Sequence, residues 1–208
     1  MISPLHAILL VPAVAVALLV LVPSYRIGAM LNMLAAGLTF MAGASLLFDP
    51  HFRSDILIVD DFNVYLVTLT TFVAFTTSIF SESYIGHELE IGRLTPTFLR
   101  YYHALYQAMI GAMNVALVAN NVGLLWVGLE VATLSTVMMV GIYRTPEAVE
   151  AAWKYFILGS VGIALVLIVF SFTNAPTGKV VSGPSSLAPA SLAGHSGDRK
   201  STRLNSSH

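Results

Sequence analysis

The sequence predicts an all-α membrane protein, a polytopic bundle of about six transmembrane helices. Hydrophobic residues make up 56% of the chain and charged residues only 10%, whereas about 25% of the residues in an ordinary soluble domain are charged. The mean hydropathy is +0.79. Several apolar runs also reach the roughly 20 residues that a helix needs to cross a bilayer. These three observations place the chain in the lipid bilayer.

Six apolar runs are expected to be membrane spans. The first lacks both the basic start and the small-residue cleavage site of a secretory signal, so we expect it to be retained. The second is rich in glycine and alanine, which lets a neighbouring helix approach closely. Before the third, Ile56–Val59 is a candidate for a short strand, and Asp60 and Asp61 form an acidic cap. The expected spans are Leu5–Val22, Ile27–Phe48, Phe62–Phe80, Tyr101–Ala119, Asn121–Tyr143 and Glu147–Phe170.

The connections between the spans predict the orientation. Ser81–Arg100 is the most polar connection, whereas Asn120 and Asn121 make a tight turn that sets the fourth and fifth spans antiparallel. Loops rich in Lys and Arg stay in the cytoplasm. Basic residues fall mainly in the odd-numbered loops, and the even-numbered loops hold only Arg53. The basic residues of the odd-numbered loops are Arg26, Arg93, Arg100 and Arg144. We therefore expect a protein of the cell inner membrane with its N-terminus outside.

The chain changes character after the sixth span. Thr173–Gly197 is rich in Ser, Pro, Gly and Ala, which predicts a flexible loop that does not pack into the core. Asp198–His208 is polar and basic, and its codons can be written as the start of a sequencing-library adapter. We expect it to be an artificial end, in which case the chain is the N-terminal part of a longer protein.

Two ionisable residues, Glu130 and Lys154, lie inside the last two spans. At about 1.5 Å per residue, Glu130 lies about 13 Å into the fifth span and Lys154 about 12 Å above the preceding turn. A charge at bilayer depth costs at least about 2.5 kcal/mol, so we expect a function for Glu130. The two depths agree within roughly 8 Å, which allows an ion pair or a water-bridged pair. Alternatively, Glu130 is protonated and hydrogen-bonded while Lys154 extends to the interface.

Few other residues suggest chemistry. His103, near the cytoplasmic start of the fourth span, is a candidate for a proton relay, or else a polar residue at the membrane interface. The histidines show no metal-ligand spacing, and the chain has no cysteine for a cluster or disulfide. No phosphate-binding loop or nucleophile elbow occurs. We therefore expect no metal, no cofactor and no catalytic residue, and a net charge of -1 gives no indication of a nucleic-acid partner.

Three motifs in the last two spans resemble a known family. They are Trp126–Ser135 (WVGLEVATLS), Val140–Tyr143 (VGIY) and Glu150–Tyr155 (EAAWKY), and Ile58–Phe62 (IVDDF) fits as well. Together they resemble the proton-translocating, antiporter-like membrane subunits of respiratory complex I, the multisubunit sodium/proton antiporters and the energy-converting hydrogenases. The variant found here is most similar to the hydrogenase 4 branch, of the formate-hydrogenlyase type. The resemblance covers roughly Leu5–Phe170.

The resemblance implies a function. Glu130 matches the glutamate of the family's proton channel, and Lys154 matches the lysine of its sixth helix. Such subunits have about fourteen helices in two inverted repeats, so this chain would be an N-terminal fragment that conducts no protons alone. Its partners would be the other subunits of a membrane oxidoreductase complex, which hold the redox centres. The complex I or antiporter branch remains an alternative, and so does a structural scaffold in which Glu130 and Lys154 only fix helix register.

Overall fold

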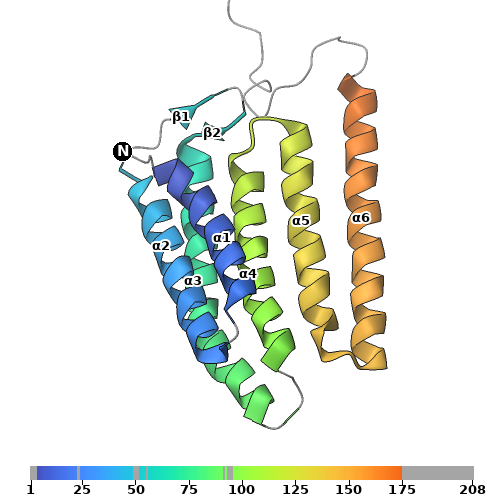
Figure 1. Cartoon of the computed structure of the whole chain (residues 1–208). Helices are drawn as coiled ribbons and strands as arrows, with labels where there is room; N and C mark the ends of the chain where they lie inside the picture. Colours follow the sequence, from blue (N-terminus) through green and yellow to red (C-terminus); the bar gives the residue numbers. More distant parts are fainter. Residues whose placement is uncertain are drawn as a thin grey trace, which may run out of the picture.

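The computed structural model describes residues 4–22, 24–48, 52–54, 56–90, 92 and 96–174. These residues form long helices and one small hairpin, and the predicted all-α bundle is confirmed (Figure 1). The predicted tail starts at Thr173, but α6 includes Thr173 and Asn174; the rest of the tail, including Asp198–His208, lies outside the described residues. The elements are α1 (Pro4–Leu21), α2 (Tyr25–Ser45), β1 (Phe52–Arg53), β2 (Ile58–Val59), α3 (Asp61–Glu90), α4 (Pro96–Val118), α5 (Val122–Val140), the 3₁₀ turn η1 (Gly141–Tyr143) and α6 (Pro146–Asn174).

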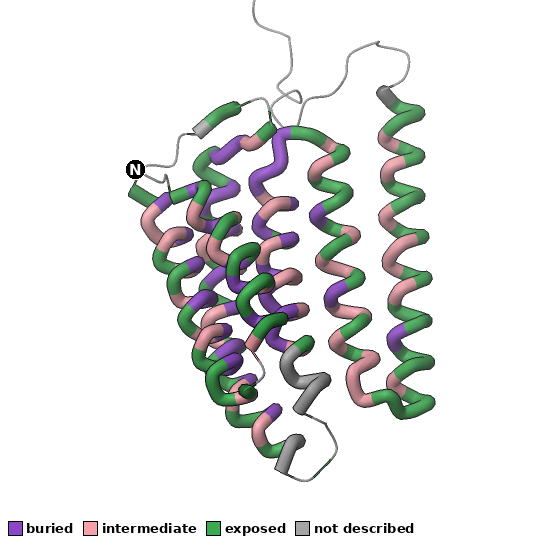
Figure 2. The backbone as a smooth tube through the Cα atoms, in the orientation of Figure 1, coloured by how far each residue is buried: buried purple, intermediate pink, exposed green. Residues whose placement is uncertain are grey.

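The helix α4 lies in the middle of the bundle, with α1–α3 on one side and α5 and then α6 on the other (Figure 1). Among the described helices, α1, α2, α3, α5 and α6 are long and apolar enough to cross a membrane. The helix α4 is not in that set, because its sequence carries His103, Gln107 and Asn114. All three side chains are buried, and the contrast with the exposed α6 is visible in Figure 2. A helix surrounded by protein does not need an apolar surface for lipid.

The predicted polar connection Ser81–Arg100 is largely helical in the structure. The helix α3 continues through most of it to Glu90, and α4 already begins at Pro96. Hydropathy detects the part of a helix that faces lipid. It does not detect a helix end that lies in water, because polar residues such as Glu form helix there without raising the hydropathy. With 30 residues, α3 is about 45 Å long, compared with a hydrocarbon core of about 30 Å. The extension is anchored by Ile85, which is 3% exposed and packs against Tyr25 and Tyr102.

The opposite end of the bundle carries the hairpin, and we call it the hairpin end. The strands β1 and β2 pair antiparallel, so the candidate strand before the third span is confirmed in part. The backbone N–H of Asn120 donates to Ile56 O at 2.8 Å, and its Nδ2 donates to Ser54 O at 2.9 Å. The hairpin loop is therefore fastened to the tight turn between α4 and α5.

The predicted acidic cap before the third span is confirmed. Asp60 Oδ1 accepts a hydrogen bond from the Asn63 N–H at 2.9 Å, just before α3 begins at Asp61. After α5 and η1, Arg144 adopts the left-handed backbone conformation with φ 52° and stops the helix. The helix α6 then starts at Pro146, a position where the missing proline N–H costs nothing. We call this end of the bundle the Arg144 end.

Glycines allow two close helix contacts. A Cβ atom on Gly43 of α2 would lie 2.8 Å from Thr71 Oγ1 of α3. A Cβ atom on Gly128 of α5 would lie 2.9 Å from both Ala112 O and Ala116 N of α4. Small residues at such crossings let backbones approach and gain van der Waals contact, which drives association in lipid. The pairs α2–α3 and α4–α5 are therefore tightly packed.

Candidate functional site

Glu130 lies on α5 and points toward α6. Its Oε1 accepts a hydrogen bond from Ser160 Oγ at 2.9 Å. The two helices approach closely beside this bond, since a Cβ atom on Gly159 would lie 3.1 Å from Thr133 Cγ2. The absence of a side chain at Gly159 thus allows the next residue, Ser160, to reach the carboxylate.

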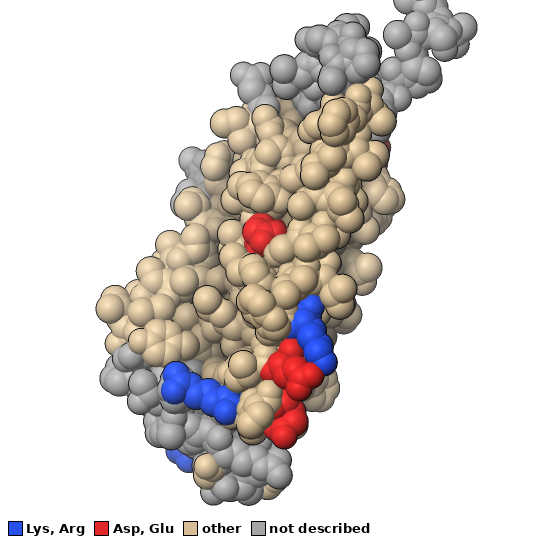
Figure 3. All heavy atoms as spheres, turned by 90° about the vertical axis from the view of Figure 1, so that its right-hand side faces the viewer, with Lys and Arg blue, Asp and Glu red and all other residues tan. Residues whose placement is uncertain are grey.

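The surroundings of Glu130 are apolar. Leu129 and Gly159, which flank the hydrogen-bonded pair in sequence, line a groove of about 470 Å³ between α5 and α6 whose walls hold no charged side chain. Figure 3 shows one isolated acidic group on this otherwise apolar face, well away from the charged residues at the Arg144 end. A carboxylate with one hydroxyl donor in such a place can accept, hold and release a proton. Glu130 is partly exposed, and its hydrogen bond joins α5 to α6.

Lys154 does not pair with Glu130, and the predicted pairing is wrong. The Lys154 Nζ instead pairs with Oε1 of Glu150, one turn earlier on α6. Both side chains are exposed, by 67% and 62% respectively. Figure 3 shows acidic and basic side chains gathered at one end of this face.

The failed pairing has a geometric reason. Lys154 precedes Ser160, the residue that meets Glu130, by six positions, which places it about 9 Å along the axis. This agrees with the depth difference of roughly 8 Å expected from sequence. Six residues also rotate the side chain by about 600°, so Lys154 points about 120° away from Ser160. Depth was predictable from residue counts, whereas the contacting face was not.

His103 lies on α4 and is almost completely buried, with 1% exposed. Its ring stacks on Tyr25 of α2 at a centroid distance of 5.7 Å and meets Tyr102 edge-on at 5.5 Å. Neither ring nitrogen has a hydrogen-bond partner. His103 is therefore enclosed by aromatic rings within α1–α4, and no described contact joins it to the Glu130–Ser160 pair.

Sequence reasoning missed several polar residues. Ser160 gave no signal, because a serine in an apolar run is common in membrane helices. The residues Asn32, Gln107 and Asn114 are each at most 1% exposed; the spacing of His103, Gln107 and Asn114 at i, i+4 and i+11 could have revealed a polar stripe on α4. In the described part of the chain, no group of three or more His, Asp or Glu side chains could hold a metal ion.

The comparisons with known proteins agree with a membrane-spanning helical bundle. The family described as NADH:quinone oxidoreductase/Mrp antiporter, TM matches residues 119–181, which include the α5–α6 pair and Glu130. Over these residues the chain is similar to this family of antiporter-like membrane subunits. It is 46% identical over 202 residues, or 96% of its length, to a hydrogenase-4 component F homolog of Methylacidiphilum infernorum.

Two further relatives carry the name subunit N. The chain is 38% identical over 81 residues to NADH-quinone oxidoreductase subunit N of Francisella tularensis subsp. holarctica, covering 38% of the chain and 16% of that relative. It is also 38% identical over 79 residues to the F(420)H(2) dehydrogenase subunit N of Methanosarcina mazei, again with 38% and 16% covered. The chain spans 42% of the length of the Methylacidiphilum relative.

Proposed function

We propose that the intact protein moves protons across the membrane as a non-catalytic subunit of an energy-converting hydrogenase of the hydrogenase 4 type. The observation that carries this proposal is Glu130, a carboxylate held by Ser160 in an apolar helix pair. A charged group in that position is costly unless it serves transport or has a partner. The relative over nearly the whole chain, a hydrogenase-4 component F homolog, supports the hydrogenase branch.

In this proposal Glu130 is the group that carries the proton. The Ser160 hydroxyl orients the carboxylate by donating to Oε1, and it can rotate to accept a hydrogen bond when the carboxyl is protonated. Lys154 lies about 9 Å closer to the Arg144 end than Ser160 does. In this proposal Lys154 is the next group in the proton path, with Glu150 as its counter-ion. Electron transfer belongs to partner subunits that hold metal clusters, because this chain has no cysteine to bind one.

A second candidate is a subunit of a quinone reductase in the inner membrane. It is supported by the relative named NADH-quinone oxidoreductase subunit N, although that match covers only 38% of the chain. Purification of the native complex separates the two candidates. Nickel–iron hydrogenase subunits in the complex favour the first proposal, whereas quinone-reductase subunits favour the second.

Proton translocation by the intact complex in sealed vesicles tests the role of Glu130. A positioned acid–base side chain contributes roughly 10²–10⁴-fold to a proton transfer, so Glu130→Gln should abolish most of the coupled proton uptake. The matched control is Glu147→Gln, which removes an exposed carboxylate at the start of α6 and should leave uptake unchanged. Parental uptake by Glu130→Gln would leave only a structural role for this residue.

A further inference from the structure

A stripe of buried polar side chains runs along the inner face of α4, on a different side of the bundle from Glu130. His103, Gln107 and Asn114 are 1%, 0% and 0% exposed. At about 100° per residue, the three positions fall within about 40° of one another around the helix axis. The stripe is about 16 Å long, which is about half of the hydrocarbon thickness.

The middle of the stripe is joined to α2. Gln107 Nε2 donates to both the backbone O and Oδ1 of Asn32, each at 2.9 Å. The backbone carbonyl can only accept, so it fixes which end of the Gln107 amide faces Asn32. As a result, Gln107 Oε1 and Asn32 Nδ2 are buried without a partner.

Six polar atoms of the stripe and of Asn32 are buried without a hydrogen-bond partner. They are Asn32 Nδ2, His103 Nδ1, His103 Nε2, Gln107 Oε1, Asn114 Nδ2 and Asn114 Oδ1. The summed penalty of six such atoms is comparable with the whole stability of a typical domain. Polar groups in this situation are normally bridged by internal water molecules that make about three hydrogen bonds each.

The Arg144 end of the stripe lies one aromatic ring away from a surface groove. This groove, of about 620 Å³, lies between α2 and α3, and its wall includes Tyr25, Arg26, Glu82 and His87. The ring of Tyr25 stacks on His103, and its hydroxyl donates to Glu82 O at 2.6 Å. Tyr25 therefore separates His103 from a polar groove that reaches the surface.

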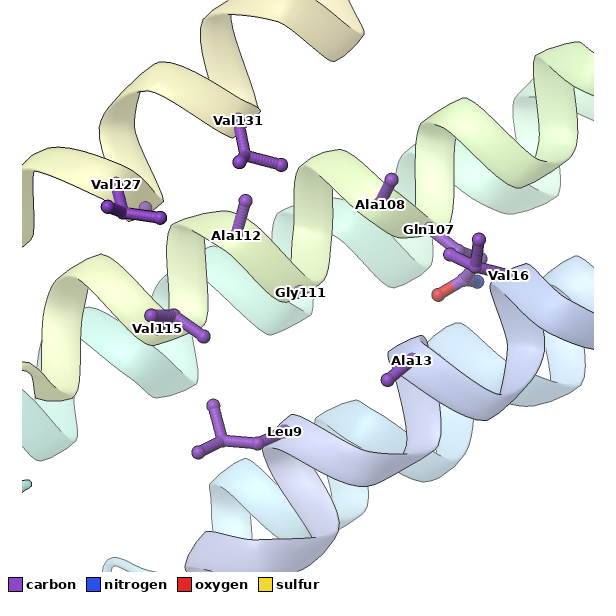
Figure 4. A pocket seen from close by; sticks show the side chains of 11 residues that line it. Leu9, Ala13, Val16, Gln107, Ala108, Gly111, Ala112, Val115, Val127 and Val131 are labelled. Carbon is purple, nitrogen blue, oxygen red and sulfur yellow. The ribbon is translucent and has the colours of Figure 1, made fainter. Parts of the chain in front are cut away.

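A second hollow beside the stripe has an almost entirely apolar lining, unlike the polar α2–α3 groove. Figure 4 shows Gln107 at the edge of a cavity of about 390 Å³ between α1, α4 and α5. All its other lining residues, such as Leu9, Val16 and Val131, are apolar. Apart from Gln107, this hollow therefore offers no polar side chain to a water molecule.

We propose that α1–α4 hold a chain of internal water molecules along the inner face of α4, from His103 past the Gln107–Asn32 pair to Asn114. The chain is entered from the α2–α3 groove at Tyr25, and it is a segment of the proton path distinct from the Glu130–Ser160 pair and in series with it. The imidazole of His103, with two unpartnered nitrogens, passes a proton by accepting it on one nitrogen and releasing one from the other. The transport part of this inference rests on the proposed function, whereas the presence of water does not.

Radiolytic hydroxyl-radical labelling of the full protein in lipid nanodiscs tests the water chain, because radicals formed in bound water oxidise the adjacent side chains. Tyr106 is the matched internal control: it is 4% exposed, it stacks on Tyr102, and its hydroxyl donates to Ala74 O at 2.7 Å. After correction for intrinsic reactivity, His103 should be labelled several-fold faster than Tyr106. Equal labelling of His103 and Tyr106 would overturn the water chain.

The proton route is tested by Gln107→Met, which keeps the side-chain size and removes the amide. It should lower both the labelling of His103 and proton uptake by the intact complex several-fold. The control Thr76→Val removes a hydroxyl that bonds only to its own helix and should change neither. Parental proton uptake by Gln107→Met would overturn the route. A failure of the proposed function at Glu130 is distinguishable, because Glu130→Gln leaves the labelling of His103 intact.

Discussion

The close contact between α4 and α5 at Gly128 allows a quantitative test of the packing. In Gly128→Ala the new Cβ would lie 2.9 Å from Ala112 O, 2.9 Å from Ala116 N and 3.0 Å from Ala116 Cβ. Each distance is shorter than the 3.4–4 Å of ordinary contact. Two of the three atoms are backbone, so a side-chain rotation cannot relieve the overlap and α5 must move away from α4. Overpacking of this kind costs typically about 1–3 kcal/mol.

The measurement is reversible unfolding in mixed micelles, followed by tryptophan fluorescence, for which Trp126 on α5 is a local reporter. The matched control is Gly162→Ala on α6, where no atom lies within 4 Å of the new Cβ. Alanine is favoured over glycine in a helix interior by roughly 0.5–1 kcal/mol, so this control should be unchanged or more stable. If Gly128→Ala unfolds at the same denaturant concentration as the parent protein, the α4–α5 contact described above is not as close as stated.

Three further predictions concern topology, the hairpin and the ion pair. A cysteine at Ser83, exposed near the end of α3, should resist labelling from the outer face of sealed cells, and ready labelling there would reverse the orientation. Asn120→Ala removes the side-chain hydrogen bond to the hairpin loop and should destabilise the protein by about 1 kcal/mol; faster proteolysis of the hairpin loop would report it, and an unchanged rate would contradict it. Lys154→Met and Glu130→Gln should have additive effects on stability, because the two residues share no contact; a coupling energy above about 0.5 kcal/mol would contradict this.

Much of the bundle could be predicted from sequence, because every helix that faces lipid needs an apolar surface. The predicted spans match the observed helices within a few residues, except at the end of α3 and the start of α4. The turn at Asn120, the cap at Asp60 and the start at Pro146 were also predictable, since each depends on local backbone chemistry. The end of α3 was not, because its last residues are polar and their helical state depends on packing at Ile85.

The candidate site was predictable in position but not in contacts. Glu130 is recognisable as a charge in an apolar run, and its depth follows from counting residues. Its partner depends on how α5 and α6 rotate against each other, which is decided by the close approach at Gly159. Glu130 therefore hydrogen-bonds to the uncharged Ser160 hydroxyl and does not pair with Lys154, the basic residue at a similar depth. A nearby carboxylate one turn away, Glu150, paired with the lysine instead.

The polar inner face of α4 has a consequence for how the chain is inserted. The helix α6, with a mean hydropathy of 2.5, can partition from the translocon into lipid by itself. A helix that carries His103, Gln107 and Asn114 cannot, because each polar group opposes transfer at the helix centre. The turn between α4 and α5 is only a few residues long, so α5 is drawn into the membrane together with α4 as a helical hairpin. Insertion of α4 therefore has to wait until α5 has been synthesised. Until then, α1–α3 must stay together near the translocon.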